Sequence, residues 1–565
     1  MNLKQVNKKV KYGISGVFIL FISFGILAFN ESRDFKLVKN IEVFSNLLRE
    51  INYFYVDDTD PETMIKTGID AMLKTLDPYT VYIPEKELDN FNFMTTGQYG
   101  GVGSLIRKSK DYIVISEVYK GFPADHAGLK AGDLIVEING KSTKNLSTTQ
   151  VSELMKGTPD SEIKITVQRY NEKEYLTKTI IRKEISIPSV PFYGMLNKET
   201  GYIRLTGFTK NASGEVRSAL LNLKKNHQPS SMILDLRGNP GGLLIESVKI
   251  TNLFVNKGME VVSTRGKVKE YYQTYKTPDQ PVDKNIALAV IVDRGSASAS
   301  EIVAGAIQDL DRGVVIGERT YGKGLVQTTR PLGYNNQLKV TTAKYYIPSG
   351  RCIQALDYSH RNENGSVGHI PDSLISEFTT HNGRKVYDGG GIAPDIKVDP
   401  DDASSITIQL YTQFLFFDYA TKYASLNESI PPVEKYTFSD TDFEDFKSFV
   451  KGKDFHYENR SSIVLQDLVK QVKKDKKYEL TSVDLDALEM KLSPNVDTDL
   501  DKNKMEIIEF LSTEIVGRYY YQAGGIKSTL KWDKGIEKAI EVLSDDKQYS
   551  SILHFTDQEV VAASN

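Results

Sequence analysis

The stretch "NIALAVIVDRGSASASEIVAGAIQDL", residues 285 to 310, has three parts. An uncharged apolar run has the length of a buried β-strand, a turn of small residues follows it, and apolar residues at helical spacing come next. Those apolar positions are Ile302, Val303, Ala306, Ile307 and Leu310. The stretch therefore predicts a strand, a tight turn and a helix with one packed face, which is one unit of an α/β sheet.

The sequence on both sides of this unit repeats the alternation. Strand-like runs include "SMILDLR", "GVVIGE" and "LKVTTAKYYI", and helix-like runs include "ASGEVRSALLNLKKN" and "LLIESVKITNLFV". Such alternation indicates a sheet whose strands are joined by crossover helices. We expect an α/β core over residues 186–400.

The residues on both sides of this core have other sequence patterns. Further domains are expected, because a chain of 565 residues is too long for one compact domain. Residues 31–95 carry apolar residues at helical spacing. Residues 96–185 consist of short β-rich runs between glycine-rich turns, which indicate a small β-domain. Residues 401–565 are charged and helical in pattern, and contain no motif that assigns them a task. The predicted fold class is a multidomain α/β protein.

The N-terminus has the pattern of a membrane anchor. Lysines at positions 4, 8, 9 and 11 precede "YGISGVFILFISFGILAF", residues 12 to 29, an uncharged run of eighteen that is long enough to span a bilayer as a helix. The lysines place the short tail in the cytoplasm and the rest of the chain outside. No small-x-small cleavage site follows, so we expect residues 1–30 to remain as a cytoplasmic tail and transmembrane helix. A cleaved signal peptide is the alternative.

Charge, cysteine and histidine content exclude several classes of protein. The net charge of −3, with lysines and acids interleaved, leaves no basic face for nucleic acid. The single cysteine, Cys352, excludes an internal disulfide, and the seven histidines have no metal-ligand spacing. We expect no nucleic-acid partner, no metal and no cofactor.

The glycine loop "GERTYGKG", residues 317 to 324, is similar to a phosphate loop, because Gly317, Gly322 and Lys323 fit the pattern G-x-x-x-x-G-K. Gly324 follows, however, where a phosphate loop has a serine or threonine for magnesium. The next run, "LVQTTRPL", has β-branched residues and a proline instead of the pattern of a helix. Nucleotide binding is therefore the weaker interpretation of this loop.

The small-residue turn offers a second role for the lysine. A turn that places a serine at the start of a helix has the geometry of a nucleophile elbow, in which the next backbone N–H stabilises an oxyanion. By composition, all three serines of the turn qualify as the nucleophile: Ser296, Ser298 and Ser300. The structural alternative is that Ser298 only caps the helix, in a capping box with Glu301. The turn has no convincing histidine partner. A lysine kept neutral by burial is the simpler base, and Lys323 lies among glycines and apolar groups.

The paired motifs "GSASASEI" and "TYGKGLVQ" resemble those of the C-terminal processing, or tail-specific, serine proteases. The resemblance extends to "LDPYT", to "LDLRGNPGG" and to "GRKVYDGGGIAPDI", and so covers roughly residues 65 to 400. It implies that Ser298 is the nucleophile, Lys323 the general base and Gln327 its support. It further implies that the N–H groups of Gly242 and Ala299 form the oxyanion hole.

The β-domain resembles the PDZ module of the same family, most clearly in "GFPADHAGLKAGDLIVEINGKS", residues 121 to 142. The resemblance implies that "YGGVG" binds the terminal carboxylate of a substrate tail. Backbone N–H groups around Gly100, Gly101 and Gly103 would cradle the carboxylate, and Val102 and Leu105 would border an apolar pocket. An ordinary glycine-rich turn is the alternative.

These patterns together predict a serine endopeptidase anchored in the bacterial inner membrane, with its catalytic part in the periplasm. It would recognise proteins or peptides with free, apolar C-termini through the PDZ domain and cleave them through an acyl-enzyme on Ser298. A non-catalytic scaffold that only binds tails is the alternative, and the intact serine, lysine and glutamine argue against it. The sequence predicts no oligomeric state.

Overall fold

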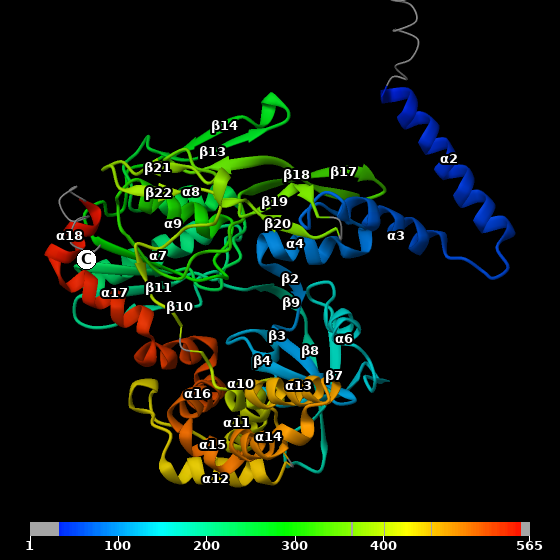
Figure 1. Cartoon of the computed structure of the whole chain (residues 1–565), viewed down its shortest axis with the longest axis vertical. Helices are drawn as coiled ribbons and strands as arrows, with labels where there is room; N and C mark the ends of the chain where they lie inside the picture. The colour runs from blue at the N-terminus through cyan, green and yellow to red at the C-terminus, as the bar shows by residue number, and fades with distance from the viewer. Residues whose placement is uncertain (1–32, 363–364, 401, 454, 555–565) are drawn as a thin grey trace, which may run out of the picture. The chain divides into compact units, whose positions relative to one another are not determined.

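The computed structural model describes residues 33–362, 365–400, 402–453 and 455–554 (Figure 1). The chain divides into two compact units, Met1–Tyr82 and Ile83–Asn565. The first unit holds the helices α2 (Arg33–Phe54) and α3 (Pro61–Lys74) and the start of the short strand β1 (Val81–Ile83). Helix α3 starts as its sequence predicts, because Asp60 caps it by accepting the Glu62 N–H at 3.1 Å and proline is its first residue.

The predicted membrane anchor, residues 12–29, lies outside the described residues. Among the helices that the structure does describe, none combines the length and the apolar character needed to cross a membrane.

The second unit begins with the 3-10 helix η1 (Glu85–Glu87) and with α4 (Leu88–Thr96), and then forms the β-domain. Its antiparallel sheet has the order β3-β4-β5-β7-β8, with β6 paired to β5. Alternate residues of β7, such as Ile163, Ile165 and Val167, are fully buried, as a half-buried strand requires. The strands are β3 (Ser104–Ser109), β4 (Tyr112–Val118), β5 (Leu134–Ile138), β6 (Lys141–Ser142), β7 (Glu162–Gln168) and β8 (Tyr175–Ile181).

Two short helices and a strand pair complete this domain. The helices are α5 (Pro123–His126) and α6 (Thr148–Met155), and α6 starts at a capping box of Ser147 and Gln150. The strands β2 (Gln98–Gly101) and β9 (Lys183–Ser186) pair with each other where the chain enters and leaves the domain.

The α/β core has a six-stranded sheet with the order β10-β11-β12-β15-β16-β23. All neighbouring strands are parallel except the edge strand β10. The inner strands are almost wholly buried because both faces of the sheet are covered. The strands are β10 (Phe192–Met195), β11 (Thr200–Arg204), β12 (Ser231–Asp235), β15 (Ala287–Val292), β16 (Val314–Gly317) and β23 (Ile396–Lys397).

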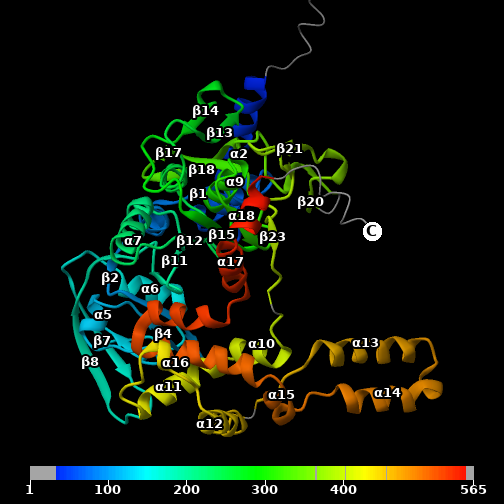
Figure 2. The same ribbon diagram turned by 90° about the vertical axis from the view of Figure 1, so that its left-hand side faces the viewer.

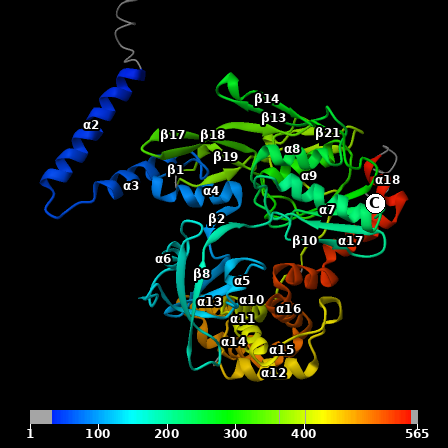
Figure 3. The same ribbon diagram turned by 180° about the vertical axis from the view of Figure 1, so that it is seen from behind.

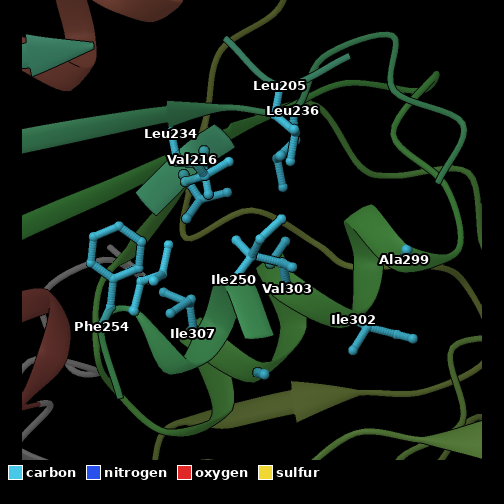
Figure 4. Packing of buried hydrophobic residues seen from close by; sticks show 14 of the residues in the cluster. Leu205, Val216, Leu234, Leu236, Ile250, Phe254, Ala299, Ile302, Val303 and Ile307 are labelled. Carbon is cyan, nitrogen blue, oxygen red and sulfur yellow. The ribbon is translucent and has the colours of Figure 1, made fainter. Parts of the chain in front are cut away.

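One face of this sheet packs against α7 (Ala212–Asn226), α8 (Leu244–Asn252) and α9 (Ala299–Asp309), which lie side by side (Figure 3). In Figure 4, Val303 and Ile307 of α9 point toward Ile250 and Phe254. The predicted packed face of α9 is confirmed, and the helix is buried further than predicted, since every residue in it is buried.

The other face of the sheet is covered by the last described part of the chain. Helices α17 (Lys534–Ser544) and α18 (Asp546–Leu553) pack on it (Figure 2). Ile536, Ala539 and Val542 of α17 lie in one apolar cluster with Ile233 and Ile291 of the sheet. These two helices of the helical extension, residues 401–565, are thus a structural layer of the α/β core.

A second, antiparallel sheet lies beside the core helices and carries the loop of Lys323. Strand β18 pairs with both β17 and β13, and β13 also pairs with β14. The bounds are β13 (Glu260–Gly266), η2 (Lys269–Tyr271), β14 (Gln273–Lys276), β17 (Leu325–Gly333) and β18 (Asn336–Tyr346). Two hairpins follow, made of β19 (Leu356–Arg361) and β20 (Val367–His369), and of β21 (Glu377–Thr379) and β22 (Lys385–Tyr387), with η3 (Asp372–Leu374) between them.

The helical extension packs around an aromatic core that includes Phe416, Tyr419 and Phe446. It contacts the β-domain directly: the Arg107 guanidinium lies 3.6 Å from the ring centroid of Phe414 and 3.9 Å from that of Phe417. Its helices are α10 (Ser405–Thr412), α11 (Leu415–Leu426), η4 (Val433–Lys435), α12 (Asp440–Lys451), α13 (Arg460–Lys474), α14 (Tyr478–Leu492), α15 (Val496–Lys502), α16 (Lys504–Thr529) and η5 (Leu530–Trp532).

Candidate active site

The turn between β15 and α9 has the strained geometry of a nucleophile elbow. Ser298 is the N-cap of α9 and has φ of 57° and ψ of −112°, which a non-glycine residue rarely adopts. The residue shares a capping box with Glu301, so the structural alternative raised by the sequence is present as well. The two roles are compatible, because a serine held at a helix start also faces the positive end of the helix dipole.

The structure separates the three serines that composition left equivalent. Ser296 and Ser300 are fully buried, and their hydroxyls donate to backbone carbonyls: Ser296 to Leu236 at 2.8 Å and Ser300 to Asn239 at 2.9 Å. Ser298 is only half-buried. Of the three, Ser298 is therefore the one whose hydroxyl an incoming substrate can reach.

The carboxylate of Glu301 joins the serine turn to the lysine loop. Its Oε2 accepts the backbone N–H of Ser298 at 2.8 Å and that of Lys323 at 2.9 Å. Its Oε1 accepts the Gly322 N–H at 2.7 Å and the Thr320 hydroxyl at 2.6 Å. Burial raises the pKa of Glu301 to about 7, and these hydrogen bonds oppose the rise. From the sequence, Glu301 was predicted only as a capping residue.

Tyr345 on β18 makes a second connection between the same two segments. Its side chain is fully buried, and its hydroxyl lies 3.2 Å from the carbonyl oxygen of Ser298 and 2.5 Å from that of Lys323. The Ser298 and Lys323 backbones are thus fixed on their N–H side by Glu301 and on their carbonyl side by Tyr345. This role was not predicted, because "LKVTTAKYYI" has the pattern of an ordinary strand.

The loop of Lys323 leads into a strand. Lys323 is half-buried, and β17 begins two residues later at Leu325. A phosphate loop requires a helix N-terminus at this point, so the structure argues against the nucleotide-binding alternative. Gln327 lies on β17, where its amide donates to Thr341 Oγ1 at 3.2 Å. Its role toward Lys323 stays a prediction.

The glycine loop after β12 lies directly against the serine turn. A Cβ atom at Gly241, whose φ is +100°, would lie 2.7 Å from the Ala297 carbonyl oxygen and 2.8 Å from Ser298 Cβ. Among the described residues, neither the Gly242 N–H nor the Ala299 N–H has an acceptor. Two backbone donors are thus left available beside Ser298, which is the arrangement that an oxyanion hole needs.

A buried charge cluster lies at the start of this glycine loop. Asp235, at the end of β12, forms ion pairs with Arg204 at 2.7 Å and Arg237 at 2.6 Å, and accepts the Tyr202 hydroxyl at 2.8 Å. Burial alone would raise the pKa of the Asp235 carboxyl, but the two arginines hold it below its ordinary value. The cluster was not predicted from the sequence, although Asp235 and Arg237 both lie in the quoted motif "LDLRGNPGG".

The structure distributes the predicted carboxylate-binding residues over a strand, a turn and an edge strand. Gly100 and Gly101 belong to β2 and pair with Glu184 and Lys183. Val102 is buried, and Gly103, with φ of +80°, turns the chain into β3. Leu105, on β3 at the edge of the sheet, is 45% exposed.

Tyr99 lies beside this turn. Burial raises the pKa of its phenol, and the nearby backbone N–H groups of Gly103 and Ser104 oppose the rise. Both N–H groups belong to the turn that the sequence predicts as the carboxylate cradle. Whether a substrate carboxylate binds there stays a prediction.

Comparison with known proteins matches three segments of the chain. Residues 199–359 match peptidase family S41, residues 114–169 match the PDZ domain, and residues 406–543 match a domain described as "Probable PDZ-protease, C-terminal helical domain". A carboxy-terminal-processing protease of Bartonella bacilliformis is 32% identical over 377 residues, which cover 66% of this chain and 83% of the relative.

Two further similarities concern a bacterial relative and a solved structure. A probable CtpA-like serine protease of Staphylococcus aureus is 34% identical over 342 residues, covering 60% of this chain and 67% of the relative. The solved photosystem II D1 C-terminal processing protease is 27% identical, covers 63% of this chain and 92% of its own, and has a TM-score of 0.34.

Proposed function

Since the chain belongs to the family of PDZ-containing C-terminal processing proteases and is a serine-type peptidase, we propose that it cleaves peptide bonds with Ser298 as nucleophile and Lys323 as general base. Its substrates are proteins or peptides whose free C-terminal tails bind the PDZ domain. The cleavage takes place outside the cytoplasm, on an enzyme held to the membrane by residues 12–29.

The observation that carries the catalytic proposal is the double connection between the serine turn and the lysine loop. One carboxylate oxygen of Glu301 accepts the N–H groups of both residues, at 2.8 and 2.9 Å, and one phenol oxygen of Tyr345 lies near both carbonyl oxygens. Two residues 25 positions apart (298 and 323) are thereby held by the same two buried groups. Fixed geometry between nucleophile and base is what proton transfer in the transition state requires.

The chemistry follows from this placement. The neutral Lys323 amine takes the proton of the Ser298 hydroxyl as Oγ attacks the substrate carbonyl carbon. The resulting oxyanion is held by the N–H groups of Gly242 and Ala299. When the peptide C–N bond breaks, Lys323 returns the proton to the leaving amine. Water, deprotonated by the same amine, then attacks the acyl ester, releases the acid and restores the Ser298 hydroxyl. Gln327 supports the position of the amine.

Tail recognition by the PDZ domain is supported by the arrangement around Gly103. Gly103, with φ of +80°, turns the chain into β3, which is an edge strand of the sheet. An edge strand offers free backbone groups to which a substrate tail adds as a further strand, with its terminal carboxylate at the glycine-rich turn.

The base assignment is tested by replacing Lys323 with arginine and with alanine. Arginine keeps a positive charge and a long side chain but does not lose its proton, so both variants should fold and both should lose peptide turnover by about 10² to 10⁴-fold. The measurement is the steady-state cleavage rate of an unstructured peptide, together with the thermal midpoint of each variant. Near-normal turnover of Lys323→Arg would show that Lys323 is not the general base.

A further inference from the structure

Asp533 lies where the chain returns from the helical extension to the α/β core. It is the N-cap of α17, and its Oδ1 accepts the N–H groups of Gly535 at 2.9 Å and Ile536 at 3.1 Å. The same carboxylate has a second set of partners. The Arg237 guanidinium approaches it with Nη1 2.9 Å from Oδ1 and Nη2 2.6 Å from Oδ2.

This contact makes Arg237 a bridge between two carboxylates. Its Nε and Nη2 also contact Asp235, at 3.0 and 2.6 Å, so that one planar guanidinium is held by Asp235 on one side and Asp533 on the other. The Asp235 side chain is fully buried, and those of Arg237 and Asp533 are 23% and 16% exposed. With Arg204 the cluster contains two arginines and two aspartates, so its charges balance only while Asp533 is present.

Arg237 stands at the beginning of the loop that provides the Gly242 N–H. The Arg237 carbonyl accepts from Arg204 Nη2 at 2.7 Å, and the next residue, Gly238, donates its N–H to Asp293 at 2.8 Å. The loop then runs to Gly241, which lies against Ser298. The charge cluster thus fixes the first residue of the loop, and contacts with the serine turn fix its end.

Helix α17 itself lies against the sheet (Figure 2) and is held there by Ile536, Ala539 and Val542. Its first turn is therefore a rigid platform, and a capping carboxylate on it is well placed to hold an arginine from another segment. The ion pair joins residues 296 positions apart in the sequence.

We infer that Asp533 is a positioning residue for catalysis: by holding Arg237, the helical extension sets the position of the oxyanion loop. This inference rests on the proposed roles of Ser298 and Gly242. It gives the last part of the extension a function in the peptidase reaction, beyond covering the sheet.

The test is Asp533→Asn in the full-length enzyme. Asparagine is as good a helix cap as aspartate, but it places an NH₂ group or a neutral oxygen where Oδ2 now accepts from Arg237. We expect kcat for an unstructured peptide to fall about tenfold with KM unchanged, because an ionic hydrogen bond to the loop anchor is lost. Asp533→Ser, which keeps a capping oxygen but has no second oxygen for Arg237 Nη2 and no negative charge, should show the same loss.

The matched control is Asp545→Asn. Asp545 caps the next helix, α18, by accepting the N–H groups of Lys547 and Gln548 at 2.9 and 3.0 Å, and has no ion pair with an arginine among the described residues. This variant should keep the wild-type kcat. Wild-type kcat in both Asp533 variants, or equal loss of kcat and thermal midpoint in Asp533→Asn and Asp545→Asn, would overturn the inference.

Ser298→Ala is assayed beside these variants, so that failure of Ser298 as the nucleophile can be told apart from failure of Asp533 as a positioning residue. If Ser298→Ala retains turnover, the proposed nucleophile fails, whatever Asp533 does. If Ser298→Ala is inactive and Asp533→Asn matches the wild type, only the positioning role of Asp533 fails.

Discussion

Ser298 and Lys323 donate their backbone N–H groups to the same atom, Oε2 of Glu301, at 2.8 and 2.9 Å. A shared buried acceptor of this kind couples the two segments, so that a shift of one loop alone leaves a buried polar group without its hydrogen bond, which costs about 1–3 kcal/mol. The proposed nucleophile and base are therefore held together by backbone contacts, independently of their own side chains.

Glu301 should make stability depend on pH. Burial raises its pKa from 4.5 to about 7 in the folded protein, so between these values the folded state holds more protons than the unfolded state. The stabilising contribution of the protonated group is complete below about pH 4.5 and is lost as the pH rises through about 7. We expect the free energy of unfolding of the wild type, relative to Glu301→Gln, to decrease over this window. Denaturant titrations at several pH values measure it, and a difference that rises with pH would contradict the prediction.

Gly241→Ala should impair catalysis more than backbone strain alone explains. The new Cβ would lie 2.8 Å from Ser298 Cβ, at a φ of +100°. We expect kcat to fall by on the order of 10²-fold, as when one oxyanion donor is displaced. Gly258→Ala is the matched control, since Gly258 has φ of +86° and open space around its Cβ position. It should lose about 1–3 kcal/mol of stability while keeping kcat, and similar turnover by the two variants would argue against the placement of the loop.

Tyr99→Phe should strengthen tail binding. Removing the phenol oxygen takes away the polar atom that the nearby N–H groups of Gly103 and Ser104 influence, so a substrate carboxylate has less to displace. Binding is measured on the full-length Ser298→Ala enzyme, with one peptide ending in a free carboxylate and the same peptide amidated. We expect about fivefold tighter binding of the free peptide by Tyr99→Phe and weak binding of the amidated one by both proteins. Equal affinity for the two peptides would show that the PDZ domain does not recognise the terminal carboxylate.

The N-terminal apolar run, residues 12 to 29, should remain in the mature protein. No small-x-small site follows it, so a signal peptidase has nowhere to cut. Intact mass of the protein purified from membranes should correspond to a chain that still contains these residues. A mature N-terminus near residue 30 would instead indicate a released enzyme.

The sequence was informative where function depends on local pattern. The apolar run before the serine turn predicted β15, and the spacing of Val303 and Ile307 predicted the packed face of α9. Composition left Ser296, Ser298 and Ser300 equivalent, and only the family resemblance pointed to Ser298. The structure supplies the physical difference, because the carbonyls of Leu236 and Asn239 bind the other two hydroxyls.

Contacts between distant segments were not predictable in the same way. Tyr345 lies in an ordinary strand pattern, and its hydroxyl reaches both loops only because β18 packs beneath them. Asp533 lies in a region without motifs, and its ion pair with Arg237 spans 296 positions. Such contacts arise from packing, and neither periodicity nor motif spacing records them.

If Ser298 is the nucleophile, the acyl-enzyme forms on its hydroxyl oxygen, and this intermediate can be trapped. The enzyme is mixed with an activated peptide ester, quenched in acid, and digested to locate the acyl group by mass spectrometry, with Ser296→Ala and Ser300→Ala as controls. We expect one acyl group on Ser298 in the wild type and in both controls, and none in Ser298→Ala. An acyl group on Ser296 or Ser300, or undiminished peptide turnover by Ser298→Ala, would contradict it.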